Sequence, residues 1–229
     1  MARDTLILSA DTSGAKFSVA LLRGDSIIAQ YQSKDTNMAS MDMLPAIDRI
    51  LSESSYRIED VGLFCIGTGP GSFTGLRVGV TTMRAMALSL NKPIIGIPSI
   101  DAIAQKLLRH KGKLCVIIDA RQNKLYARIY ESNGKFIKPK SRFLLIEIDK
   151  LLKKLKGSIV FAGDGINLYK DSIKKASHIK SEFLPAKDWY AKAATLGRIA
   201  CASRKRPKKA EVFTLSPLYI YPKECQVRR

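Results

Sequence analysis

Residues 67–79 read Gly-Thr-Gly-Pro-Gly-Ser-Phe-Thr-Gly-Leu-Arg-Val-Gly, and this glycine run lies between an apolar strand-like segment and an apolar helix-like segment. Glycine adopts positive φ without a Cβ clash and proline fixes φ, so the spacing specifies a tight backbone path that opens onto a helix N-terminus. The amides along such a path point the same way, toward an anion or toward a closely packed neighbour. The glycine run is therefore either a close-packed turn or a binding loop, and both interpretations stay open at this stage.

The glycine run does not match two common phosphate-binding motifs. A P-loop ends in Gly-Lys-Ser/Thr, because the lysine neutralises the phosphate and the hydroxyl holds magnesium. Here Leu76 follows Gly75. A dinucleotide fingerprint that begins at Gly69 would need glycine at the position of Thr74. Neither motif explains the run.

The composition is that of an ordinary globular protein. The chain has 229 residues, of which 46% are hydrophobic, so it can bury one large core or two small ones. No stretch approaches the roughly 18 consecutive apolar residues of a membrane span, and the N-terminus enters strand-like sequence without a secretion signal. We therefore expect a cytoplasmic protein with no membrane partner. The cysteines have no paired spacing, which predicts reduced thiols; they are Cys65, Cys115, Cys201 and Cys225.

The net charge of +19 lies entirely in the second half of the chain. Residues 1–100 hold nine Lys/Arg and nine Asp/Glu, whereas residues 101–229 hold 30 and 11. A basic half can bind RNA phosphates with release of counterions, or it can be a lysine-rich surface that faces water. Aromatic residues are sparse and no RNA-reading motif is present. We favour general surface charge, with direct RNA binding as the alternative.

Apolar periodicity in the first half predicts three hairpin-linked strands, followed by alternating helices and strands. This β-β-β-α-β-α-β-α order is that of a ribonuclease-H-like α/β fold. The predicted strands cover residues 5–11, 16–23, 26–33, 62–67 and 93–97, and the predicted helices cover residues 40–54, 76–90 and 99–109.

The second half repeats the pattern, with Asp119 ending its first strand as Asp11 ends that of the first half. We therefore predict a duplicated ribonuclease-H-like fold with two subdomains. The first covers residues 1–98 and is completed by a C-terminal segment of about 205–229, and the second, basic subdomain covers residues 99–204. Its predicted strands cover residues 114–119, 124–131, 136–145 and 158–162, and its predicted helices cover residues 146–155, 166–176 and 189–203.

A duplicated fold with an aspartate after the first strand resembles the actin, sugar-kinase and heat-shock ATPase superfamily. Within it, the chain resembles the bacterial TsaB (YeaZ) family, through motifs that extend in family order over nearly the whole sequence. The glycine run is the specific motif, and the short motifs are weak alone. The short ones are Leu8-Ser9-Ala10-Asp11-Thr12-Ser13, Leu44-Pro45, Asp119-Ala120-Arg121, Gly163-Asp164-Gly165 and Pro217-Leu218-Tyr219.

This resemblance implies a non-catalytic scaffold or activating subunit of the complex that forms N6-threonylcarbamoyladenosine at position 37 of ANN-decoding tRNAs. The implied partners are the catalytic transferase TsaD, with which the chain would dimerise, the ATPase subunit TsaE, and tRNA through the complex. A homodimer is the alternative assembly. No cofactor is expected on this chain alone, whereas ATP or ADP and a metal are expected in the complex or its partner.

Three differences from the resembled proteins limit what the resemblance carries over. TsaD binds its metal through paired histidines, whereas this chain has only His110 and His178, so no metal site is predicted. Ala39 precedes Ser40 where the family commonly has histidine, and Tyr221 stands where arginine is usual. The resemblance therefore implies no role for the side chains of Ala39 and Tyr221.

Asp11 is the candidate for a carboxylate that positions magnesium and phosphate, because the resemblance places it at that position of the superfamily. Thr12 and Ser13 could supply donors beside it, and Gly71 and Ser72 of the glycine run complete the nucleotide-proximal candidates. Aspartate and serine at strand ends also form turns through side-chain to backbone hydrogen bonds. We favour this turn role.

The alternative function is a stand-alone ATPase or phosphotransferase that uses Asp11. It would need a second carboxylate across the cleft, for which Asp119 and Asp164 are available. A peptidase would need a nucleophile with an adjacent base or a metal, and the sequence offers no credible candidate.

A partner surface is expected on the two helices that flank the glycine run. Methionine adapts to irregular surfaces and small residues allow helices to approach closely, although methionine on a helix is more often core. In the resembled family these helices contact the catalytic subunit or a second copy of the chain. The expected interface residues are Met43, Ile47, Phe73, Leu76, Val80, Met83 and Met86.

Overall fold

The computed structural model describes residues 4–33, 39–203 and 211–220, and within them all side chains except those of residues 39–41. Tyr221 and much of the predicted C-terminal segment lie outside these ranges. The chain forms two compact units. The first runs to Ala102 and resumes from Ala191 to Leu218, and the second is formed by Ile103–Tyr190 together with Tyr219 and Ile220.

The first unit is built on a five-stranded sheet with the order β3-β2-β1-β4-β5. β1 pairs antiparallel with β2 and parallel with β4, so a hairpin trio continues into parallel strands. This is the ribonuclease-H-like arrangement that the sequence predicted. The strands are β1 (Leu6–Asp11), β2 (Ser18–Arg23), β3 (Ser26–Gln32), β4 (Leu63–Gly67) and β5 (Ile94–Ile97).

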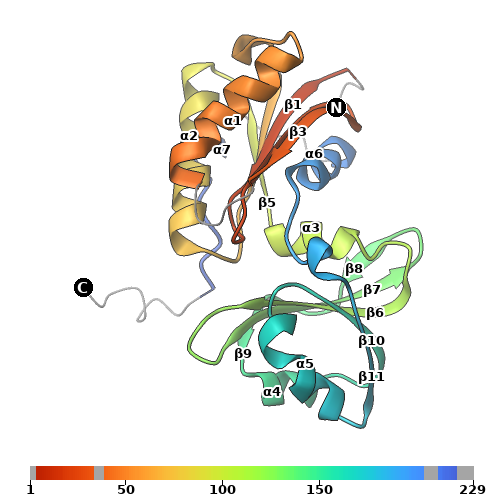
Figure 1. Ribbon diagram of the computed structural model, residues 1–229. Helices are drawn as coiled ribbons and strands as arrows, with labels where there is room; N and C mark the ends of the chain where they lie inside the picture. Colours follow the sequence, from red (N-terminus) through yellow and green to blue (C-terminus); the bar gives the residue numbers. More distant parts are fainter. Residues whose placement is uncertain (1–3, 34–38, 204–210, 221–229) are drawn as a thin grey trace. The chain divides into compact units, whose positions relative to one another are not determined.

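Both faces of this sheet are covered by helices (Figure 1). α1 (Ala39–Glu53) and α2 (Phe73–Ser89) lie on one face, and α6 (Ala193–Ala202) lies on the other. Every residue of β1 is buried, which explains its nearly continuous apolar sequence, since a central strand covered on both sides has no face for water.

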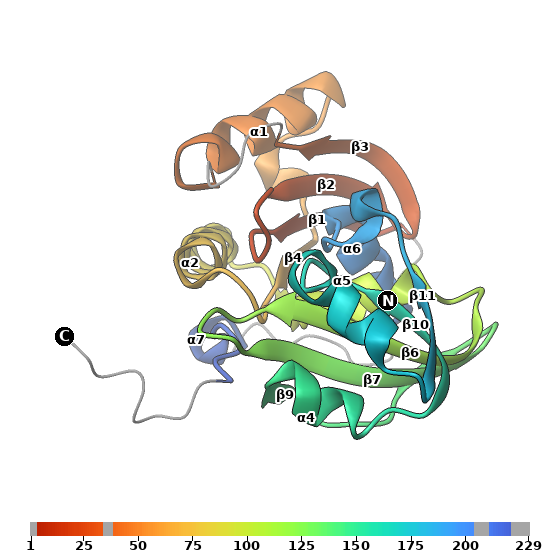
Figure 2. The same cartoon turned by 60° about the horizontal axis from the view of Figure 1, so that its bottom comes forward.

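The second unit repeats this topology. Its sheet has the order β11-β10-β6-β7-β8, in which β6 pairs antiparallel with β7 and parallel with β10. The long strands β6 and β7 run side by side across Figure 2. The duplicated fold is therefore confirmed. The elements are β6 (Lys111–Asp119), β7 (Leu125–Asn133), β8 (Ile137–Pro139), β9 (Leu144–Ile146), β10 (Gly157–Ala162), β11 (Ile179–Phe183), α4 (Ile148–Leu152) and α5 (Ile166–Lys175).

The remaining helical elements connect or complete the two units. α3 (Ser99–Gln105) leads from β5 toward the second unit, and α7 (Glu211–Thr214) follows α6 in the returning segment. The guanidinium of Arg84 donates to the carbonyls of Val212 (2.7 Å) and Phe213 (3.4 Å), which fixes α7 on α2. Two 3-10 turns lie at Ile58–Asp60 and Ala186–Asp188.

The chain returns to the first unit earlier than the predicted division at residues 98 and 204 implies. The return begins at Ala191, because α6 is attached to the first sheet at its N-terminus. The Ser9 hydroxyl donates to the carbonyl of Ala193 (2.8 Å), and the Ser18 hydroxyl accepts from the amide of Ala193 (2.9 Å). The helix expected at residues 189–203 thus belongs to the first unit.

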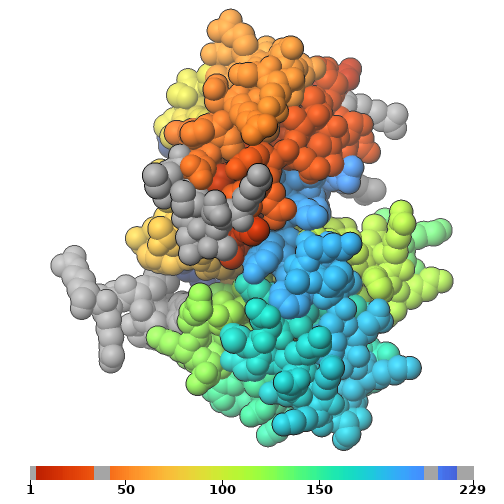
Figure 3. Space-filling model, in the orientation of Figure 1, coloured from red at the N-terminus to blue at the C-terminus, as the bar shows by residue number. Residues whose placement is uncertain are grey.

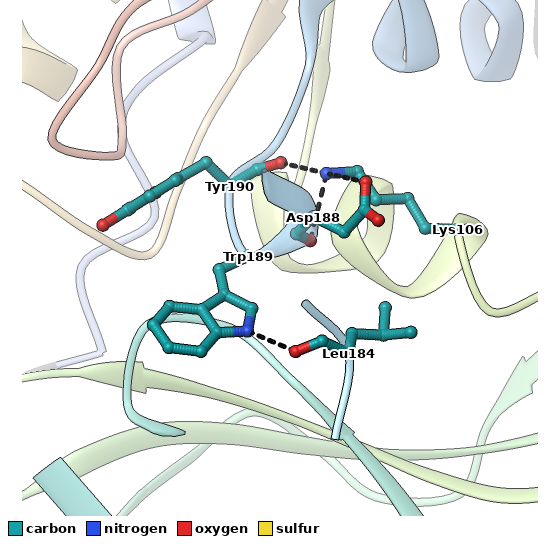
Figure 4. A network of polar contacts seen from close by, with 5 residues as sticks. All are labelled: Lys106, Leu184, Asp188, Trp189 and Tyr190. Carbon is teal, nitrogen blue, oxygen red and sulfur yellow. Dashed lines mark hydrogen bonds and ion pairs between the residues drawn. The ribbon is translucent and has the colours of Figure 1, made fainter. Parts of the chain in front are cut away.

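Lys106 closes the second unit where the chain enters and leaves it (Figure 4). Its ammonium group donates to the carbonyls of Asp188 (3.0 Å) and Tyr190 (2.6 Å) and lies 3.8 Å from the Asp188 carboxylate. The indole of Trp189 donates to the carbonyl of Leu184 (2.8 Å). Because the Lys106 side chain is 12% exposed, these bonds are shielded from water and hold the two chain segments together.

Cys65 and Cys115 are free thiols at the centres of β4 and β6. Burial raises the pKa of both thiols above the ordinary value, that of Cys115 to about 12. Because the thiolate is the nucleophile, we expect both to resist alkylation near pH 8 in the native protein, whereas the partly exposed Cys201 reacts faster. Mass spectrometry after iodoacetamide treatment, with Cys225 replaced by serine, measures the order. Rapid labelling of Cys65 without unfolding would contradict it.

None of the helices formed by the described residues has the length and apolar character needed to cross a bilayer.

Candidate functional site

The Asp11 carboxylate is buried at the C-terminal end of β1, with 1% of the residue exposed. Its Oδ1 accepts from the amide (3.0 Å) and the hydroxyl (2.7 Å) of Ser13, and its Oδ2 accepts from the hydroxyl of Ser99 (2.6 Å). Hydrogen bonds of this kind compensate a buried charge. Both carboxylate oxygens are therefore already bound by groups of the first unit.

The five predicted nucleotide-proximal residues do come together, and they pack on one another. The amide of Ser72 donates to the carbonyl of Ser13 (2.8 Å), which joins the glycine run to the turn after β1. A Cβ at Gly71 would overlap that same carbonyl. Thr12, which precedes Ser13 in this turn, is also buried. Its hydroxyl has no hydrogen-bond partner among the described residues.

The spacing of the glycines follows from close contact with the turn after β1. A Cβ at Gly67 would overlap the Asp11 carboxylate, and one at Gly75 or Gly79 would overlap Thr12. Glycine is required at these places because backbone and side chain approach too closely for any other residue. Of the two interpretations, the structure supports the close-packed turn.

Several amides of the glycine run are engaged within the first unit. Gly69 donates to the Ser99 hydroxyl (3.1 Å), and Gly75 donates to the Ser72 hydroxyl (3.2 Å), which caps α2. α2 begins at Phe73, three residues before the predicted start. Ser99 is the residue that sequence reasoning missed: it joins Asp11 to Gly69, and its only local signal was its position after a proline at a strand end.

The second unit holds two carboxylates, Asp119 and Asp164, at the corresponding ends of β6 and β10. The Asp164 carboxylate accepts from the amide of Asp119 (3.0 Å), and Asp119 accepts from the amide of Arg121 (2.8 Å) and pairs with its guanidinium (3.2 Å). Burial raises the pKa of Asp164 above its usual value. Both carboxylates thus accept hydrogen bonds from backbone amides at these strand ends. Within the described residues, no three His, Cys, Asp or Glu side chains are grouped to hold a metal.

The predicted interface on α1 and α2 needs a correction. Five of its seven residues are core residues with at most 3% exposed surface, whereas Met86 is partly buried against that core and Phe73 is 53% exposed. The methionine face of each helix meets the sheet, so these side chains hold the helices in place and do not face outward. The five buried residues are Met43, Ile47, Leu76, Val80 and Met83.

The surface left open on these helices is a different set of residues. α1, orange in Figure 3, forms part of the outer surface of the first unit, and Leu44 is 57% exposed there. On α2, exposed residues recur three or four positions apart and form one stripe without a carboxylate, with the Arg77 guanidinium stacked 3.9 Å over the Phe73 ring. We call it the α2 stripe; it consists of Phe73, Arg77, Thr81, Ala85 and Leu88.

The topology defines the class of the protein: it is a duplicated ribonuclease-H-like protein. The family model described as TsaD, tRNA N6-adenosine threonylcarbamoyltransferase, matches residues 38–224. The chain therefore belongs to this family, and within it to the TsaB (YeaZ) proteins that the sequence analysis recognised.

Relatives from several bacteria carry the name tRNA threonylcarbamoyladenosine biosynthesis protein TsaB. The protein of Bacillus subtilis (strain 168) is 28% identical over 225 residues, which is 97% of this chain and 96% of the relative. That of Escherichia coli (strain K12) is 28% identical over 223 residues, which is 93% and 94% of the two chains. The solved structure of YeaZ from Pseudomonas aeruginosa matches with a TM-score of 0.76 and 20% identity, over 94% of this chain and all of that one. This likeness shows the same fold.

Proposed function

We propose that the chain is a non-catalytic subunit of the complex that forms N6-threonylcarbamoyladenosine at position 37 of ANN-decoding tRNAs, and that it acts in the cytoplasm by dimerising with TsaD. Membership of the family and the names of the TsaB relatives support the pathway. The observation that carries the non-catalytic role is the state of Asp11, whose two carboxylate oxygens bind Ser13 and Ser99.

A stand-alone ATPase would need that carboxylate free for magnesium and would need loop amides that face a phosphate. In the first unit, Cβ atoms at Gly67 and Gly71 would already overlap Asp11 and Ser13, so the space where phosphate would approach Asp11 is filled by the chain itself. We therefore expect no nucleotide on this chain alone. ATP or ADP and a metal would be held in the complex or by TsaD.

The α2 stripe and Leu44 form the proposed contact with TsaD. Three large apolar side chains that are more than half exposed stand on two adjacent helices, namely Leu44, Phe73 and Leu88, and exposed apolar groups rimmed by polar residues mark interaction sites. Binding there would stabilise one arrangement of the partner, because a ligand shifts a conformational equilibrium by its difference in affinity for the two states. A homodimer would use the same surface and compete. TsaE and tRNA would be further partners, tRNA through the complex.

Reconstitution of the tRNA modification from purified components tests this function. We expect no product when this chain is omitted, restoration when it is added back, and no ATP hydrolysis by the chain alone. Modification that proceeds at the same rate without it would contradict the proposal. Enzyme-like ATP turnover by the isolated chain, lost in Asp11→Asn, would instead establish the ATPase.

A further inference from the structure

The charge of the second unit is concentrated at one edge of its sheet. Residues 103–190 contain 20 Lys/Arg and eight Asp/Glu. β6, β10 and β11 are parallel neighbours, so their first residues share an edge, and neighbouring strands lie roughly 5 Å apart. Eight exposed lysines, which we call the basic rim, lie at these strand starts or in the segments that lead into them; they are Lys111, Lys113, Lys153, Lys154, Lys156, Lys174, Lys175 and Lys180.

Strand register places Lys113 and Lys180 in successive rows at the same end of the sheet, on either side of β10 and on opposite faces. Lys113 of β6 is paired with Ile159 of β10, and Ser158 of β10 is paired with Lys180 of β11. The Lys113 ammonium reaches the carbonyl of Lys156 (3.4 Å), in the turn between α4 and β10. Four separate chain segments thus contribute ammonium groups to the same end of the sheet.

No basic-rim lysine forms an ion pair with a described residue, whereas Lys106, Lys140 and Lys150 elsewhere in the unit do. Two carboxylates lie at the opposite edge, where Asp119 ends β6 and Asp164 follows β10, whereas Glu131 lies across from Lys113 and is paired with Lys140. Lysines at a helix C-terminus are favoured by the helix dipole, which accounts for the two in the last turn of α5. The helix dipole does not account for the lysines at the strand starts, so the uneven charge distribution of the unit needs a separate explanation.

We propose that the basic rim binds the phosphate backbone of RNA, independently of base sequence. Lysine ammonium groups are point charges that contact phosphates without reading base edges. Six of the eight rim lysines lie at strand starts or in turns, and not on an amphipathic helix that would enter a membrane surface. The choice of RNA among polyanions rests on the proposed function, whose substrate is a tRNA. Contact with TsaD is assigned to the first unit, so the two sites are separate.

Two triple variants of the full chain test this proposal. In the rim variant, Lys113, Lys156 and Lys180 become glutamine. In the control variant, three lysines of the same unit away from the rim become glutamine, so that both variants lose the same charge; they are Lys124, Lys170 and Lys187. Binding of a fluorescent RNA hairpin is measured across a salt series, with far-UV circular dichroism to verify folding.

We expect the rim variant to bind the hairpin roughly 100-fold more weakly near 0.1 M salt, and its logarithmic salt dependence to fall by about 2 to 3, because three phosphate contacts are lost. The control variant should change by less than about 3-fold. Equal losses in both variants, or no binding by the unmodified chain, would overturn the inference. Binding to phosphatidylserine vesicles but not to the hairpin would assign the rim to membranes instead. None of these results bears on the proposed contact with TsaD, because reconstitution with TsaD tests that contact independently.

Discussion

Asp11→Ala is expected to lower the free energy of unfolding by about 3 kcal/mol, because the substitution strands three buried donors and each loss of a hydrogen bond to a charged group costs about 1.5 to 3 kcal/mol before relaxation. The donors are the Ser13 amide and hydroxyl and the Ser99 hydroxyl. Urea denaturation followed by far-UV circular dichroism measures the change. Asp48→Ala, at an exposed position on α1, is the matched control and should change stability by less than about 0.5 kcal/mol.

This result would distinguish a structural aspartate from a catalytic one. A carboxylate kept for magnesium is commonly dispensable for stability, since function and stability compete at such sites. Unchanged stability in Asp11→Ala would therefore argue against the turn role that we assign to Asp11.

The second large effect is a loss of stability expected at a core residue of α2, which distinguishes the core of this helix from its surface. Met83 is fully buried, so Met83→Lys would place an unpaired charge in the core and should destabilise the first unit by more than about 4 kcal/mol. Loss of TsaD binding in that variant would report unfolding and would say nothing about an interface. Thermal melting followed by circular dichroism detects this directly.

The interface is tested by Phe73→Asp combined with Leu88→Lys. An acid at the first turn and a base at the last turn suit the helix dipole, and Asp at 73 can pair with Arg77 four residues on, so the fold should be kept. We expect TsaD binding to weaken by about 100-fold, or about 2.7 kcal/mol, in co-purification and calorimetry.

The control exchanges equally exposed apolar residues of the second unit, Phe136→Asp with Leu168→Lys, which are 67% and 61% exposed. This control should bind TsaD normally. If both double variants bind TsaD like the unmodified chain, the α2 stripe is not the contact.

Local patterns predicted most elements, and the misses have physical causes. β11 was missed because Ile179–Phe183 is an edge strand with two charged residues in five, so its apolar signal is weak. The strand expected at residues 136–145 is two short strands, β8 and β9, which pair with different ends of β7. Hydrophobic periodicity shows which residues are apolar. It does not show where a segment stops pairing with one end of a neighbouring strand and begins to pair with the other.

Five of the seven predicted interface side chains are core residues for a related reason. The helical period correctly grouped Met43 with Ile47 and Met83 with Val80. It could not tell whether that face meets the sheet or a second protein, because both surfaces demand the same apolar spacing.

The sequence by itself determined the two repeats, the tight path of the glycine run and the family, because these depend on residue order and on conformations that only glycine and proline adopt readily. Only the tertiary structure decided what Asp11 does. Its partner Ser99 lies 88 residues away in the chain, and parallel strands bring their ends together whatever the distance in sequence. The role of a carboxylate depends on the groups that bind it, and the local spacing of residues does not show which groups these are.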